Sequence, residues 1–194
     1  YGSCDIFVTF LRNGKWTNPK NLGPKVNHKT HDAQPSMSSD GRTLYFSSTR
    51  PGGYGENDIY VTYLTSSGWS VPQNLGGVIN TPGREEGVFI HPDNQTLYFS
   101  SDGHPGLGDN DLFMSKRNPD GSWGKPVNLG YPINTSKNDF DFTVDALGEY
   151  AYLTSDREGG FGDWDIYKFK FPDYLKPKPV SYMSGRTFDI ETNK

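Results

Sequence analysis

The sequence has 194 residues, of which 32% are hydrophobic and 14% aromatic, and 19 basic and 23 acidic residues give it a formal net charge of −4. The charges are well mixed and form no basic stripe, which argues against nucleic acid as a partner. No apolar run approaches the roughly 18 residues that span a bilayer, so we expect no direct membrane insertion by this segment.

A repeat of about 53 residues organises the sequence from its first residues onward. The pattern Asp–Ile/Leu–aromatic recurs at intervals of 53, 53 and 54 residues, beginning at Asp5, Asp58, Asp111 and Asp165. Tryptophans keep the same register as Trp16, Trp69 and Trp123, and this repetition predicts that they pack between repeats. The first residues correspond to the middle of a repeat, so we expect an internal fragment of a longer protein.

Each repeat holds four short extended runs, which in one complete repeat cover residues 87–91, 96–100, 111–115 and 122–127. Turn signals such as Asp120-Gly121 separate them, and no segment shows a sustained helical period. Four antiparallel strands per repeat are typical of a β-propeller blade, whereas a β-solenoid has shorter repeats. We therefore predict an all-β fold in which residues 1–171 form a partial β-propeller that does not close into a ring by itself.

The pattern changes after the last repeat. Residues 172–179 are rich in proline and predict a stiff linker. Residues 180–194 are interpreted as the start of a second β domain, a β-sandwich. The last repeat lacks a fourth strand, which an upstream strand would supply on ring closure.

The repeat resembles the WD40-like propeller units of the TolB type, through residues 38–48, Arg50, the glycines of residues 52–55 and Asp58-Ile59-Tyr60. The tail resembles the opening of carboxypeptidase-regulatory-like domains through Gly185, Asp189 and Thr192. This pair is similar to the layout of OmpA-family envelope proteins, some of which serve type IX secretion and gliding. The resemblance implies a periplasmic, outer-membrane-associated protein that reaches peptidoglycan only through a module outside this sequence.

Two sets of repeated carboxylates are candidates for chemistry. Asp32, Glu85 and Asp139 precede the first strand of each repeat, where a ring of acids would suit a cation or a sugar. Asp58, Asp111 and Asp165 follow Gly-rich loops and offer hard oxygen ligands for calcium. Because both sets recur in every repeat, we favour a structural role that fixes loops, since catalytic acids and bases need unlike environments.

Other reactive residues have no evident partners. His28, His31 and His104 lie in loops that supply no complete zinc ligand set, and Cys4 has no paired base. The Gly-rich loops connect strands and open no helix, so they do not predict phosphate binding. We therefore predict no catalytic residue, no cofactor and no metal.

Long loops at residues 75–86 and 48–57 emerge on one face of a blade, where binding usually occurs. We expect protein partners to contact exposed side chains there, with these candidates: Arg50, Tyr54, Arg84, Arg157 and Phe161. The leading hypothesis is a non-catalytic scaffold module that binds protein partners in the cell envelope. The alternative is a propeller glycan hydrolase or a glycan-binding domain.

Overall fold

The computed structural model describes residues 2–183, and within this range the chain consists of short strands, turns and loops with one brief 3-10 helix, η1 (Asp173–Leu175). The strands pair antiparallel with strands close to them in sequence and form separate small sheets. The predicted all-β class is therefore confirmed.

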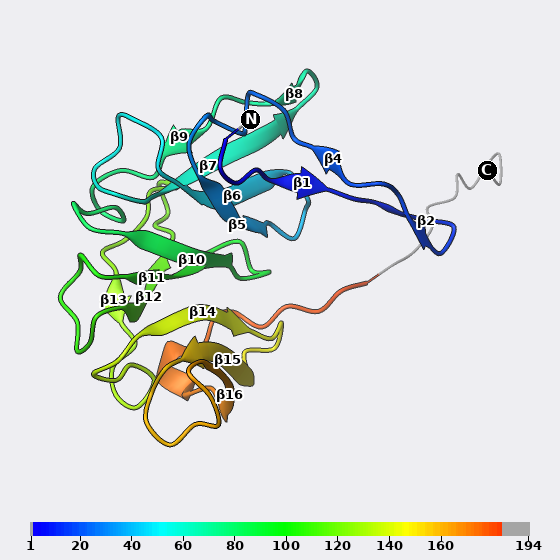
Figure 1. Ribbon diagram of the computed structural model, residues 1–194. Coiled ribbons are helices and arrows are strands. Elements are labelled where there is room, and N and C mark those ends of the chain that lie inside the picture. The colour runs from blue at the N-terminus through cyan, green and yellow to red at the C-terminus, as the bar shows by residue number, and fades with distance from the viewer. Residues whose placement is uncertain (1, 184–194) are drawn as a thin grey trace.

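Three sheets correspond to the repeats and are called the first, second and third blade (Figure 1). The first blade contains β5 (Asp32–Met37), β6 (Thr43–Ser48), β7 (Asp58–Thr65), β8 (Gly68–Trp69) and β9 (Gln73–Asn74). The second contains β10 (Glu85–Ile90), β11 (Thr96–Ser101), β12 (Asp111–Lys116) and β13 (Val127–Asn128). The third contains β14 (Asp139–Val144), β15 (Tyr150–Ser155) and β16 (Asp165–Lys170).

A two-stranded N-terminal ribbon precedes the first blade. It is formed by β1 (Phe7–Val8) with β4 (Lys20–Asn21), and its tip by β2 (Leu11–Arg12) with β3 (Lys15–Trp16). In the repeat, β1 and β2 together correspond to the third strand of a blade and β3 and β4 to the fourth, as the spacing of the repeat predicts. Figure 1 shows the ribbon projecting away from the blades.

The same register recurs in each blade. The aspartates that open the third strands face serines that end the second strands, as Ser48↔Asp58, Ser101↔Asp111 and Ser155↔Asp165. Each first strand also carries a β-bulge, at a residue with left-handed backbone: Gln34 (φ 50°), Gly87 (φ 56°) and Asp141 (φ 48°). The bulges lie at equivalent positions of β5, β10 and β14, which contact one another in that order, and we call this row of first strands the inner edge of the blades.

The hydrophobic core lies between the blades because alternate residues of each second strand point to opposite neighbours. In β6, Leu44 and Phe46 pack toward the N-terminal ribbon, while Tyr45 packs toward the second blade. The cluster between the second and third blades contains Tyr98 and Phe142, whose ring centroids are 5.0 Å apart. Each blade is therefore stabilised by its neighbours, as in a propeller.

The blades form an open arc, with β5, β10 and β14 adjacent in that order (Figure 1). Within residues 2–183, no strand of the third blade contacts a strand of the N-terminal ribbon. This arrangement agrees with the predicted partial propeller.

The proline-rich segment, for which we predicted a stiff linker, packs against the blades. Leu175 is 3% exposed and joins the core between the second and third blades, together with Phe171. Backbone hydrogen bonds continue along the segment, including Val180 N to Ala146 O at 2.8 Å. Burial of apolar side chains, Leu175 above all, holds this segment on the propeller. Of the predicted β-sandwich, Gly185, Asp189 and Thr192 lie outside the described residues.

Candidate functional site

The aspartate that opens each third strand holds the Gly-rich loop before it. Asp58 accepts hydrogen bonds from Tyr54 N at 2.6 Å, Gly55 N at 3.1 Å and Asn74 Nδ2 at 2.8 Å. Asp165 accepts bonds from Phe161 N at 2.8 Å and from the following backbone N–H in the same way. Asp111 accepts them from the backbone of residues 107 and 108. These carboxylates bind backbone donors and thereby keep the loops against the strands.

The acids predicted to precede the first strands are in fact their first residues, and they are fully buried and also hold loops. Asp32 lies 2.7 Å from Arg50 Nη2, and Asp139 lies 2.6 Å from Arg157 Nη2. Both guanidinium groups stack on an aromatic ring of the third strand, 4.9 Å from the Tyr60 centroid for Arg50 and 4.8 Å from the Tyr167 centroid for Arg157. Each arginine also donates to a loop carbonyl, which ties the loop from the preceding blade to the first strand.

The second blade departs from this pattern at the same position. Glu85 accepts hydrogen bonds from Thr81 Oγ1 and Ser101 Oγ, both at 2.7 Å, and burial raises its pKa above the ordinary value for glutamate. Gly103 stands at the repeat position of the arginine, and the adjacent His104 makes the corresponding contacts: its Nε2 lies 2.7 Å from Ile79 O, and its ring packs against Phe113 at 5.2 Å. The arginine–aspartate pair is thus replaced by a glutamate held by hydroxyl groups.

Two of the five predicted partner-binding residues, Arg50 and Arg157, have side chains that are mostly buried. We expected Arg50 and Arg157 to be exposed, but their side chains are 12% and 19% exposed and are ion-paired within the blade. The buried carboxylates of Asp32 and Asp139 draw both guanidinium groups inward, because a buried charge needs an opposite charge. Arg50 and Arg157 therefore stabilise the fold of their blades.

The other three candidates are exposed. Tyr54 is 56% and Phe161 105% exposed, and the Arg84 side chain is 49% exposed with Asp102 at 2.8 Å. The loops of Tyr54 and Arg84 are in contact, because Glu56 N donates to Gly83 O at 3.0 Å. The structure thus groups Tyr54 with Arg84, while Phe161 lies on the loop of the third blade.

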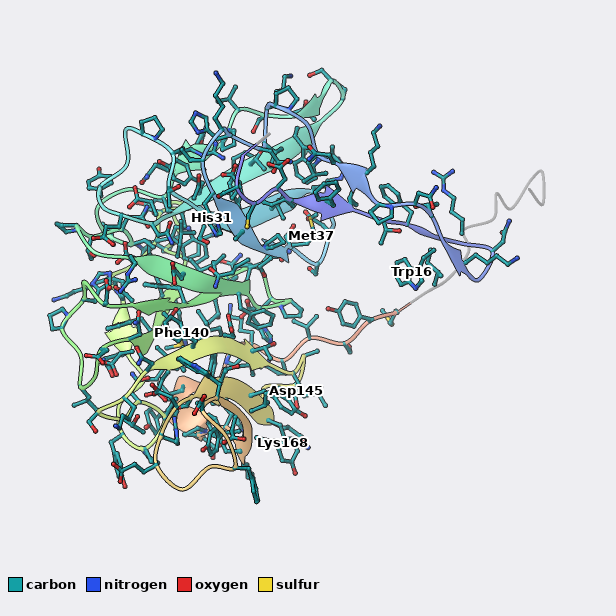
Figure 2. All side chains as sticks on the ribbon, viewed as in Figure 1. Trp16, His31, Met37, Phe140, Asp145 and Lys168 are labelled. Carbon is teal, nitrogen blue, oxygen red and sulfur yellow. The ribbon has the colours of Figure 1, made fainter. Side chains whose placement is uncertain are left out.

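The repeated tryptophans occupy three different environments. Trp123 is 9% exposed and meets Tyr45 of the first blade edge-on, with ring centroids 6.1 Å apart. Trp69 is half-buried against the cluster between the ribbon and the first blade. Trp16 is 68% exposed on the projecting ribbon (Figure 2). Each tryptophan is buried to the extent that a preceding blade or ribbon lies against it.

The inner edge contains a group of residues that the sequence reasoning missed. Gln34, Gly87 and Asp141 occupy one repeat position on the bulges of β5, β10 and β14, yet they are three unlike residues. A hollow of about 290 Å³ lies beside them, and its lining residues are Gln34, Glu86, Phe140, Asp141, Thr154 and Trp164. Desolvation raises the pKa of Asp141 above the ordinary value for aspartate. In the sequence, the only sign of this site is that Gln34, Gly87 and Asp141 differ although they share one repeat position.

Neither a cluster of metal-ligating side chains nor a long apolar helix occurs among the described residues. Residues 2–183 contain no group of three or more His, Cys, Asp or Glu side chains placed to hold a metal ion. In the same range, the only helix is a single 3-10 turn, far too short to cross a bilayer.

Comparisons with known proteins support the fold. No protein-family model matches the sequence, and no curated protein matches it. Among solved structures, the chain is similar to TolB from Acinetobacter baumannii, with a TM-score of 0.56, 16% identity, and coverage of 92% of this chain and 38% of that one. It is equally similar to a putative TolB from Agrobacterium tumefaciens, with a TM-score of 0.56, 16% identity, and coverage of 84% and 56%.

The fold is therefore that of a TolB-type β-propeller. The chain spans less than two thirds of the length of either TolB structure. A weaker likeness, with a TM-score of 0.45 and 18% identity, extends to an alpha-L-arabinofuranosidase from Lactobacillus brevis, and it carries no argument about activity.

Proposed function

We propose that this domain is a non-catalytic protein-interaction module of the cell envelope, located in the periplasm and associated with the outer membrane. The TolB-type propeller supports this reading, and so does the resemblance to OmpA-family proteins of type IX secretion and gliding. In this proposal the long-loop face binds a protein partner, and peptidoglycan is reached only through a module outside this sequence.

The observation that carries the proposal is that the repeated carboxylates are bound to groups within the domain. Asp32 and Asp139 are buried in ion pairs with arginines, and Asp58 accepts backbone hydrogen bonds. A general acid or base must be free to exchange a proton with a substrate, and these groups are held by internal donors. Their arrangement supports a rigid scaffold with exposed loops.

The partner surface in this proposal is centred on Tyr54 and Arg84, because exposed aromatic and arginine side chains contribute most of the binding energy in many interfaces. The test is cross-linking and co-purification of the full-length protein from envelope extracts, with Tyr54→Ala and Arg84→Ala combined. We expect the recovered partner to decrease while the melting temperature is unchanged. Tyr174→Ala is the control, because Tyr174 is 75% exposed at a distant position. Equal recovery with the double variant would contradict this surface.

A second candidate function is binding or hydrolysis of a glycan. One observation favours it: Glu86 and Asp141 are carboxylates that break the repeat, and both line the hollow at the inner edge. Unlike environments for two carboxylates are what acid–base chemistry on a glycosidic bond requires. A glycan-hydrolysis screen tests it, and turnover that is lost in Asp141→Asn would favour the enzyme over the scaffold.

A further inference from the structure

The hollow beside Asp141 is lined by residues that depart from the repeat at further positions as well. The second residue of each first strand differs from blade to blade: Ala33, Glu86 and Phe140. The residue before the aspartate that opens each third strand also changes: Asn57, Asn110 and Trp164. Asn57 and Asn110 donate hydrogen bonds to the blade that follows, to Glu86 and to Asn138 Oδ1 respectively. Trp164 thus replaces an asparagine that elsewhere joins two blades.

The third blade has an aromatic corner at these positions. The rings of Phe140 and Trp164 have centroids 5.7 Å apart and planes inclined by 51°, and Trp164 is 49% exposed (Phe140 is marked on β14 in Figure 2). Both rings line the hollow of about 290 Å³. Trp164 belongs to the Gly-rich loop of the third blade, as Tyr54 belongs to that of the first, so the hollow adjoins the long-loop face.

The charge of the hollow is negative and is not balanced. Of residues 2–183, those that line it include the carboxylates Glu86 and Asp141 and no lysine, arginine or histidine. Glu86 accepts a hydrogen bond from Asn57, whereas Asp141 accepts no side-chain hydrogen bond and forms no ion pair with any residue in this range. Aromatic faces and carboxylates both attract a cation, so the hollow favours a positively charged group.

The blades themselves show which cation fits between a ring and a carboxylate. In the first blade Arg50 Cζ lies 4.9 Å from the centroid of the Tyr60 ring, and Arg50 Nη2 lies 2.7 Å from Asp32. Arg157 makes the same two kinds of contact in the third blade. A guanidinium group is planar, so it stacks on a ring while its N–H groups bind a carboxylate. The hollow offers this combination without an arginine of its own.

We propose that the hollow binds an arginine side chain that a protein partner presents to the long-loop face. The guanidinium group stacks on Trp164 and donates hydrogen bonds to the carboxylate of Asp141, and the charge of Glu86 adds to the attraction. This inference rests on the proposed function, because that function supplies the protein partner. It adds the chemical group that the partner carries and the place where this group binds.

The test is an NMR titration of the full chain with an amidated tripeptide that has a central arginine, followed at the indole N–H of Trp164. The same tripeptide with citrulline has the shape of arginine without the charge, and the tripeptide with lysine has the charge without the planar group. We expect the arginine peptide to bind at least about tenfold more tightly than the citrulline peptide and more tightly than the lysine peptide. Its affinity should decrease at higher ionic strength.

Absence of binding, or equal affinity for the arginine and citrulline peptides, would overturn the proposal. Equal or tighter binding of the lysine peptide would overturn the assignment to arginine, because only a guanidinium group stacks on the ring while it pairs with the carboxylate.

Asp141→Asn removes the charge and keeps the shape of the side chain, and asparagine tolerates the left-handed backbone at this position (φ 48°). We expect this variant to keep its melting temperature and to bind the arginine peptide at least about tenfold more weakly, with no change for the citrulline peptide. Trp164→Leu should weaken the arginine peptide by about threefold or more. Full affinity in Asp141→Asn would overturn the proposed site.

Asp163→Asn is the matched control, because Asp163 is an exposed neighbour of Trp164 that does not line the hollow. It removes the same charge and should leave the affinity for the arginine peptide unchanged. An equal loss in Asp163→Asn and Asp141→Asn would show general attraction to negative charge and overturn the site.

The peptide titration uses purified protein and therefore fails or succeeds independently of the scaffold proposal. If the arginine peptide binds but no protein is recovered from envelope extracts, the proposed function is wrong and the arginine site stands. If a partner is recovered in amounts that depend on Tyr54 and Arg84 but the arginine peptide does not bind, the proposed function stands and the arginine site is wrong.

Discussion

Arg157 Nη2 lies 2.6 Å from Asp139 Oδ1 in the third blade, and this pair reproduces the contact of Arg50 with Asp32 in the first blade. In both pairs the carboxylate is buried and the arginine also donates to a loop carbonyl of the preceding segment. The pair therefore joins a long loop to the first strand of its blade.

Loss of the arginine should leave a buried carboxylate without its counter-charge. We expect Arg157→Ala to lower the free energy of unfolding by about 3–5 kcal/mol, measured by urea denaturation with an unchanged m-value. Arg84→Ala is the control, because the Arg84 side chain is 49% exposed beside Asp102 and should cost less than about 1 kcal/mol. Equal losses in the two variants would contradict a structural role for Arg157.

The repeated tryptophans should contribute to stability in the order of their burial. Trp123→Ala removes a ring packed against Tyr45 and should cost about 3–5 kcal/mol. Trp69→Ala should cost less, and Trp16→Ala, at a ring that is 68% exposed, should change stability by no more than about 0.5 kcal/mol. Thermal denaturation of the three variants gives the order, and equal effects would disprove it.

The segment after the last blade strand should behave as part of the core. Leu175→Ala is expected to destabilise the protein by about 2–5 kcal/mol, because it leaves a cavity between the second and third blades. Tyr174→Ala changes the adjacent residue, which is 75% exposed, and should have little effect. Chemical denaturation compares the two, and an unchanged stability for Leu175→Ala would show that the segment is a free linker.

Stability should decrease in alkaline solution through Tyr45. Burial raises the pKa of Tyr45 to about 12, although Arg117, which donates to its hydroxyl at 2.6 Å, acts in the opposite direction. In the unfolded chain the hydroxyl loses its proton near pH 10, so above this pH the unfolded state is favoured until the folded state also ionises near pH 12. Tyr45→Phe should reduce the dependence of the free energy of unfolding on pH between these values. An identical pH dependence in the variant would contradict this role.

The repeat in the sequence was sufficient to predict the first three strands of each blade, whereas the fourth, predicted at residues 122–127, is β13 (Val127–Asn128) with an isolated bridge between Arg117 and Trp123 before it. Asp58, Asp111 and Asp165 each begin a third strand, and their side chains hold the preceding loops. Strand boundaries and hairpin turns depend on residues close in sequence, so a spacing of 53 and 54 residues was enough to place the first three strands of each complete repeat.

The tertiary structure decided which repeated residues are buried and where a site is formed. Trp16 and Trp123 share one repeat position, yet only Trp123 has a neighbouring blade against which to pack. Arg157 lies in a loop, and from the sequence we expected its side chain to be exposed. Its charge partner, Asp139, lies 18 residues earlier and is buried, so the arginine is drawn inward. Gln34, Gly87 and Asp141 share one repeat position, and only the tertiary structure shows that Gln34 Oε1 accepts a hydrogen bond from Gly87 N of the second blade. Burial and hydrogen bonding at these positions depend on contacts between blades, which local sequence patterns do not encode.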